Sequence, residues 1–197
     1  VIEATGTALY LWSVWLAAKR RTLTWPVGNA GVILLAILFY QIRLYSDLVE
    51  QGYFLVTGFY GWWAWAGRGA DPERPISRIT RAPARTLVVS AAVLLAGSLA
   101  MGFAMGRIHA WLPAQFPEPA SFPYLDAFTT VASFVATILL AHRQLESWHL
   151  WIAVDVIGIG LYARKEVYLL SLVYVVFLVL AVKGLVAWRA ALREQAS

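Results

Sequence analysis

Long uninterrupted runs of apolar residues dominate the chain. A helix needs about 20 predominantly apolar residues to cross the hydrocarbon core of a bilayer. Runs of roughly this length predict seven transmembrane helices, at 1–18, 27–45, 48–66, 86–105, 125–141, 148–163 and 167–188. The runs are continuous rather than alternating in polarity, which excludes a membrane β-barrel. We therefore expect an all-α integral membrane protein without a separate soluble domain.

Two polar segments that contain prolines interrupt this pattern, at 68–85 and at 106–123. They isolate the fourth run and leave three runs on each side, a 3+1+3 arrangement. A tryptophan followed four residues later by an amide or acid occurs in the second and sixth runs, at Trp25 and Asn29 and at Trp151 and Asp155. This similarity indicates two parallel three-helix repeats, with chance resemblance between apolar segments as the alternative.

The predicted domains follow from these interruptions. The fourth run reads as a tightly packed connector, because Gly102 and Gly106 have the spacing that permits close helix contact. The expected organisation is a first repeat, a region with the connector helix at 86–105, a second repeat and a short tail, at 1–66, 67–124, 125–190 and 191–197.

Composition and charge agree with a membrane protein. Of the 197 residues, 60% are apolar and 14% charged, and the mean hydropathy is +0.66. If the N-terminus is outside, the inner segments hold twelve basic residues: Lys19, Arg20, Arg21, Arg68, Arg74, Arg78, Arg81, Arg85, Arg143, Lys183, Arg189 and Arg193. The outer segments hold four: Arg43, Arg107, Arg164 and Lys165. This asymmetry predicts an N-out, C-in orientation and explains the net charge of +5 without nucleic acid. No basic segment precedes the first run, which we expect to be a permanent span rather than a signal peptide.

Asp155 is the most informative single residue, because it lies within an otherwise apolar run. A charge near the centre of a membrane helix costs about 2.5–3.5 kcal/mol or more and is usually functional. Trp148, Trp151, Asp155 and Tyr162 fall on one helical stripe. Indoles beside a carboxylate suit a flat solute that is cationic or strongly hydrogen-bonding.

Polar side chains also recur in other runs, and their joint occurrence predicts a polar cavity shared between helices. Satisfied hydrogen bonds between helices are the alternative explanation for each one alone. Most other tryptophans are expected in an aromatic belt at the inner interface: Trp15, Trp25, Trp62, Trp63, Trp65 and Trp188.

Enzymatic chemistry finds little support in the sequence. The chain has no cysteine, no nucleophile elbow, no zinc-binding helix and no phosphate-binding loop. We therefore expect no catalytic residues, metal or cofactor. An intramembrane hydrolase that uses Asp126 and Asp155 is the rival from the enzyme class.

Several short motifs occur in an order and spacing that together resemble one family. They are Ile2-Glu3-Ala4-x-Gly6-Thr7, Trp25-Pro26-x-Gly28, Gln41-x-x-Leu44-Tyr45 with Gln51, Tyr60-Gly61-Trp62-x-Ala64-Trp65, Phe122-Pro123-x-x-Asp126, Glu146-x-Trp148-x-x-Trp151-x-x-x-Asp155 and Ser171-Leu172-x-Tyr174. Nearly the whole chain resembles the PnuC type of bacterial vitamin transporters, best known for nicotinamide riboside. The resemblance implies a fold similar to that of the SWEET sugar transporters, a homotrimer in the bacterial inner membrane, and facilitated diffusion. It also implies that a cytosolic kinase traps the vitamin by phosphorylation.

The same resemblance implies the binding residues: Asn29, Gln51, Trp148, Trp151, Asp155, Tyr162, Ser171 and Tyr174. Trp151 would stack on the solute, and Asp155 would orient or neutralise it. Some members that transport nicotinamide riboside have Asn in place of Asp155, and relatives for thiamine or riboflavin share the Trp-x-x-Trp pattern. Nicotinamide riboside is the expected vitamin, with thiamine as the alternative and riboflavin less favoured. Nicotinamide riboside and thiamine both contain a permanently cationic ring that an acid suits, whereas riboflavin is neutral and gains less.

Overall fold

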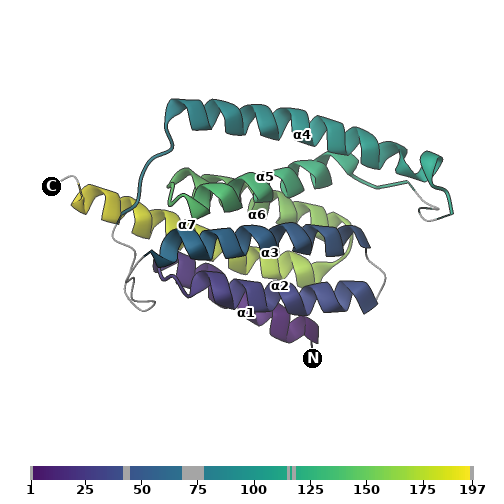
Figure 1. Ribbon diagram of the computed structural model, residues 1–197. Helices are drawn as coiled ribbons and strands as arrows, with labels where there is room; N and C mark the ends of the chain where they lie inside the picture. The colour runs from purple at the N-terminus through teal and green to yellow at the C-terminus, as the bar shows by residue number, and fades with distance from the viewer. Residues whose placement is uncertain (1, 42–44, 68–77, 115, 117–118, 196–197) are drawn as a thin grey trace.

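Seven helices form the part of the chain that the computed structural model describes, residues 2–41, 45–67, 78–114, 116 and 119–195 (Figure 1). The helices are α1 Ile2–Ala18, α2 Thr24–Gln41, α3 Tyr45–Ala66, α4 Ala84–Trp111, α5 Pro123–Ala141, α6 Glu146–Arg164 and α7 Tyr168–Glu194. The prediction of an all-helical protein is confirmed. Arg43, Arg68 and Arg74, which contributed to the predicted orientation, lie outside the described residues.

Six helices form a bundle, and α4 lies along one side of it (Figure 1). α1 packs on α2 and α7, α3 on α2 and α5, and α6 on α5 and α7, whereas α4 contacts only α5 among the described helices. Two indole hydrogen bonds show how the helices run. Trp188 Nε1 donates to the Ala17 carbonyl, and Trp65 Nε1 donates to the Ala141 carbonyl, both at 3.1 Å. The C-terminal ends of α1, α3, α5 and α7 therefore meet at one end of the bundle.

The two halves of the bundle repeat the same contacts. Arg20 and Arg143 both have φ of 60° in the turns after α1 and α5. The ring of Trp25 lies against the backbone of Gly61, and the ring of Trp148 lies against Gly184. The same separation in residue number relates Trp25 to Trp148, Gly61 to Gly184 and Trp65 to Trp188. The structural counterpart of Trp25 is therefore Trp148, so the predicted match of Trp25 and Asn29 with Trp151 and Asp155 is wrong.

Helix ends differ from the predicted ones for local reasons. α2 begins before Pro26, because proline is tolerated in the first turn of a helix, where its missing N–H has no intrahelical partner. α4 continues to Trp111, so Gly106 lies within the helix rather than at the start of a polar segment. Tyr124 packs closely on Gly102, whereas most of α4 is exposed, so tight packing is limited to its contact with α5.

Four of the described helices, α2, α4, α5 and α7, are long and apolar enough to cross a membrane by themselves. α1 is only 17 residues long, and α3 and α6 carry polar residues along their length. Two of these helices, α3 and α6, supply the acids Glu50 and Asp155 that are described below. The structure is thus that of a multi-pass membrane protein in which polar helices are held among apolar ones.

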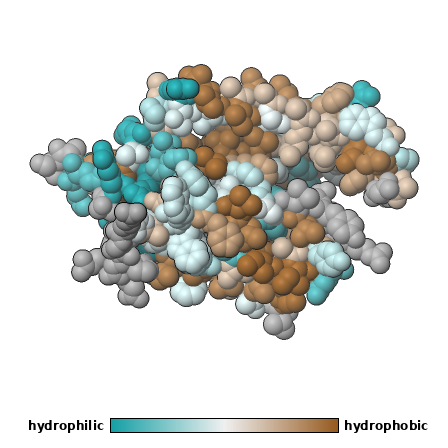
Figure 2. Space-filling model, viewed as in Figure 1, coloured by the Kyte–Doolittle hydropathy of each residue, from teal (hydrophilic) through white to brown (hydrophobic). Residues whose placement is uncertain are grey.

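The surface and the buried tryptophans refine the picture. Figure 2 shows apolar residues over α4, and hydrophilic residues gathered at the end where α7 finishes. Trp15, Trp62 and Trp63 are exposed, as an aromatic belt requires. Placing Trp25, Trp65 and Trp188 in that belt is wrong, because all three are buried in the bundle.

Candidate functional site

Asp155 lies in the middle of α6 and is only 4% exposed. Its carboxylate has no hydrogen-bond or ion-pair partner among the described residues. A buried charge of this kind is costly unless a group of opposite charge or a strong donor meets it. The structure shows that Asp155 is buried, and its contact with a solute stays a prediction.

Two tyrosines stack beside this acid. The rings of Tyr162 on α6 and Tyr174 on α7 have centroids 5.3 Å apart and are nearly parallel. Gly158 permits this arrangement, because the ring of Tyr174 lies against its backbone where any side chain would stand. Asp155 and Tyr162 lie two turns apart on one face of α6, and the ring of Tyr174 packs on Gly158 between them. The structure thus brings together three of the predicted site residues.

Further polar groups come from α1 and α3. Glu50 on α3 is within electrostatic range of the hydroxyls of both Tyr10 and Tyr174. The Tyr10 hydroxyl donates to Gln51 Oε1 at 3.5 Å. We call this group the tyrosine–acid cluster: Tyr10, Glu50, Gln51, Asp155, Tyr162 and Tyr174.

The sequence analysis misses Glu50 and does not single out Tyr10 among the polar side chains that recur in the other runs. The available signal was an acid directly before Gln51 inside a predicted membrane run. The importance of Glu50 depends on contacts between α1, α3 and α7, which no local sequence pattern reveals. The cluster therefore contains a second carboxylate from the first half of the chain.

Asn29 and Ser171 occupy different surroundings from the acids. Asn29 on α2 is buried against Gly58 of α3, and its Nδ2 has no hydrogen-bond partner among the described residues. Ser171 Oγ donates to the Ile159 carbonyl at 2.9 Å and so ties α7 to α6. Contact of these two side chains with a solute stays a prediction.

Trp148 is part of a chain of four buried indoles that fills the end of the bundle where α1, α3, α5 and α7 finish. Trp25 contacts Trp65 at 5.4 Å between ring centroids, Trp65 contacts Trp188 at 6.1 Å, and Trp188 contacts Trp148 at 5.6 Å. Trp148 is 1% exposed, which favours a packing role. Trp151, one turn further along α6, is only partly buried and lies at the edge of this cluster. Of the two predicted indoles, Trp151 has the more accessible ring.

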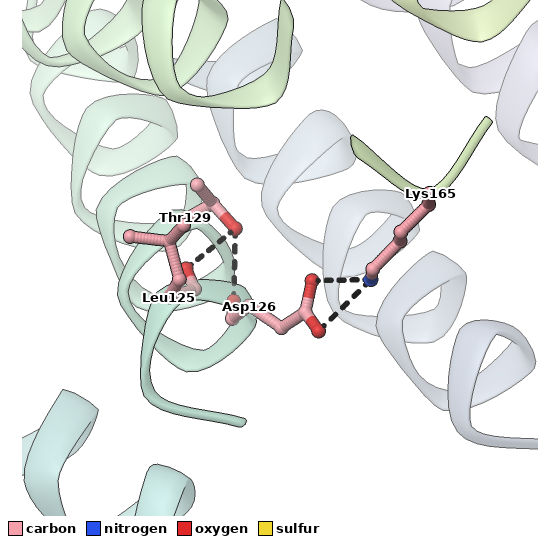
Figure 3. A network of polar contacts seen from close by, with 4 residues as sticks. All are labelled: Leu125, Asp126, Thr129 and Lys165. Atoms are coloured by element: carbon pink, nitrogen blue, oxygen red, sulfur yellow. Dashed lines mark hydrogen bonds and ion pairs between the residues drawn. The ribbon is translucent and has the colours of Figure 1, made fainter. Parts of the chain in front are cut away.

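Asp126 belongs to a separate polar contact (Figure 3). Lys165 Nζ donates to both carboxylate oxygens of Asp126 at 3.0 Å, and both side chains are partly exposed. The Thr129 hydroxyl donates to the carbonyls of Leu125 and Asp126 and does not touch the carboxylate. Asp155 lies in the middle of α6, whereas Lys165 follows the last residue of that helix. This geometry pairs Asp126 with a lysine and does not form the acid dyad that a hydrolase would need.

Comparison with known proteins places this arrangement in a family. A model of the nicotinamide mononucleotide transporter family matches residues 1–190. The chain belongs to this family. The nicotinamide riboside transporter PnuC of Escherichia coli strain K12 is 30% identical over 211 residues, covering 100% of this chain and 88% of that protein. The riboflavin/roseoflavin transporter RibM of Streptomyces davaonensis is 26% identical over 189 residues, covering 94% of this chain and 83% of that protein.

A solved structure agrees with the fold. The crystal structure of the vitamin B3 transporter PnuC superposes with a TM-score of 0.72 at 22% identity, covering 98% of this chain and 82% of that one. The resemblance to PnuC proteins that the motifs indicated is therefore confirmed, and so is vitamin transport as the function. A buried carboxylate beside aromatic rings has the chemistry to favour a cationic aromatic solute.

Proposed function

We propose that this PnuC-family protein takes up nicotinamide riboside by facilitated diffusion. The observation that carries the proposal is the buried Asp155 carboxylate, which has no partner among the described residues and lies beside the Tyr162 and Tyr174 pair. Nicotinamide riboside has a permanently cationic pyridinium ring. Such a ring gains from charge pairing with a carboxylate and from contact with aromatic faces.

The roles of the side chains follow from their positions. Trp151 stacks on the pyridinium ring, because its own ring is only partly buried. Glu50 on α3 adds negative potential. Gln51 and Asn29 hydrogen-bond the ribose or the amide. Trp148 packs on Trp188 in the indole chain, one turn before Trp151 on α6. Ser171 holds α7 against α6 and keeps Tyr174 in place.

The membrane potential is sufficient to drive this uptake. A monocation that crosses about 100 mV, negative inside, gains about 2.3 kcal/mol, which corresponds to roughly fifty-fold accumulation. A cytosolic kinase that phosphorylates the vitamin removes the free form and maintains inflow. No coupling ion is needed for net uptake under these conditions.

The proposed topology places the N-terminus outside and the C-terminus inside the bacterial inner membrane. The repeated contacts of the Trp25–Gly61 and Trp148–Gly184 pairs support two parallel three-helix repeats with α4 as the connector, as in the SWEET transporters. The indole chain then lies at the inner end, and its rings must separate when the site opens inward. A homotrimer with α4 facing lipid or a neighbouring subunit completes the proposal.

Calorimetric titration of the purified protein in detergent tests the choice of vitamin. We expect binding of nicotinamide riboside, with the affinity reduced in Trp151→Ala. Trp111→Ala, which removes an exposed indole at the end of α4, is the matched control and leaves binding unchanged. Preference for riboflavin, the solute named for the Streptomyces relative, or for thiamine would refute the vitamin assignment and keep the family function.

Uptake into proteoliposomes tests the mechanism. With the potential clamped by potassium and valinomycin, facilitated diffusion predicts that accumulation follows the potential alone. Loss of uptake when only a proton gradient is collapsed would contradict it and would indicate proton coupling.

A further inference from the structure

A polar pocket lies away from the tyrosine–acid cluster, at the end of the molecule where α6 begins and α7 finishes. It has a volume of about 580 Å³ and is lined by Arg81, Leu145, Glu146, His149, Arg189, Leu192 and Arg193. The hydrophilic residues in Figure 2 gather at this end. Vitamin transport, as proposed above, uses none of these side chains.

The charge of this pocket is strongly unbalanced. Three guanidinium groups and one imidazole face one carboxylate, that of Glu146. No carboxylate forms an ion pair with Arg81, Arg189 or Arg193 in the described part of the chain. Arg189 Nη2 is 2.9 Å from His149 Nε2, so this guanidinium is held by a neutral partner and retains its charge for a ligand.

The carboxylate of Glu146 in this pocket already accepts a hydrogen bond. The Ala82 backbone N–H donates to Glu146 Oε2 at 2.7 Å. This bond draws the carboxylate toward the segment that precedes α4. The carboxylate keeps its charge, but the three guanidinium groups outweigh it, so the electrostatic potential of the pocket is positive.

The wall that carries Arg81 is held rigidly. Thr80 N donates to the Arg143 carbonyl and Leu145 N donates to the Thr80 carbonyl, both at 3.0 Å. Ile79, 2% exposed, packs in the same apolar cluster as Leu145. Arg81 thus enters the pocket from a backbone that is bonded to the turn before α6. Such preorganisation lowers the entropy cost of binding a ligand between Arg81 and the arginines of α7.

We propose that this pocket binds a phosphate group. Guanidinium forks match phosphate oxygens in geometry and charge, and several of them around one concave site are typical of phosphate recognition. The positive-inside rule accounts for basic residues at this end, but it requires neither a pocket nor a hydrogen-bonded wall. The group is carried by a membrane phospholipid or by a soluble phosphorylated compound. The proposal does not rest on which vitamin the transporter carries.

Calorimetric titration of the whole chain in a neutral detergent, at about 0.15 M salt to screen weak surface attraction, tests this site. The probes are inorganic phosphate and soluble dihexanoyl phosphatidylglycerol, with dihexanoylglycerol as the phosphate-free control. We expect at least one phosphate probe to bind, and Arg189→Gln and Arg193→Gln each to weaken it about tenfold. Arg164→Gln, which removes an exposed arginine at the other end of α6, leaves binding unchanged.

The outcomes separate the sources. Binding of inorganic phosphate indicates a soluble ligand, whereas binding of the phosphatidylglycerol alone indicates a lipid headgroup. Silence of both probes, or binding that Arg189→Gln and Arg193→Gln both retain, overturns the proposal. If Arg189→Gln lowers the melting temperature, Arg193→Gln decides alone, because Arg193 is exposed and its side chain has no hydrogen bond within the described residues.

Discussion

Replacing Asp155 by Asn tests the proposed charge pairing directly, because it removes the charge and keeps the size of the side chain. Asp155 is 4% exposed, so water screens it little. At about 4–6 Å and an effective dielectric constant of about 20, a unit charge pair gains about 3–4 kcal/mol. Desolvation of both groups offsets roughly half of this gain. We therefore expect the affinity for nicotinamide riboside to fall by about ten- to thirty-fold.

The informative comparison uses a neutral solute of the same shape. Calorimetry with reduced nicotinamide riboside, whose ring is uncharged, should show little change between the native protein and Asp155→Asn. Asp126→Asn is the matched control, because this carboxylate is paired with Lys165, which follows the C-terminal end of α6. An equal loss of affinity for the charged and the neutral solute would refute charge pairing, and so would an unchanged affinity for both.

Three further predictions concern stability. Trp148→Ala should lower the free energy of unfolding by about 3–5 kcal/mol, because it empties a site that is 1% exposed; denaturant titration measures this, and unchanged stability would contradict it. Gly184→Ala should lower the melting temperature, because its Cβ would lie 2.6 Å from the Trp148 ring, whereas Gly160→Ala meets open space; equal melting temperatures would be inconsistent with the packing. Lys165→Met should change the unfolding free energy by no more than about 1 kcal/mol, because its ion pair is partly exposed, and a larger loss would indicate a structural role.

Helices and their number were predictable because each apolar run is a local property of the chain. Asp155 was predictable for the same reason, since a charge is conspicuous among apolar neighbours. The family was predictable from the order of short motifs. Which residues of the two halves correspond was not predictable, because the sequence allows Trp25 to be matched with either Trp148 or Trp151. Only the contacts with Gly61 and Gly184 show which tryptophan is the counterpart.

The sequence by itself determined the membrane class, the helices and one buried acid, because composition and periodicity act along a single segment. The tertiary structure decided which side chains share a site. It joined Tyr10 to Gln51, paired Asp126 with Lys165, and buried Trp148 in the indole chain. These results depend on contacts between helices that are far apart in the chain. Such contacts are set by the packing of whole helix faces, which no short stretch of sequence specifies.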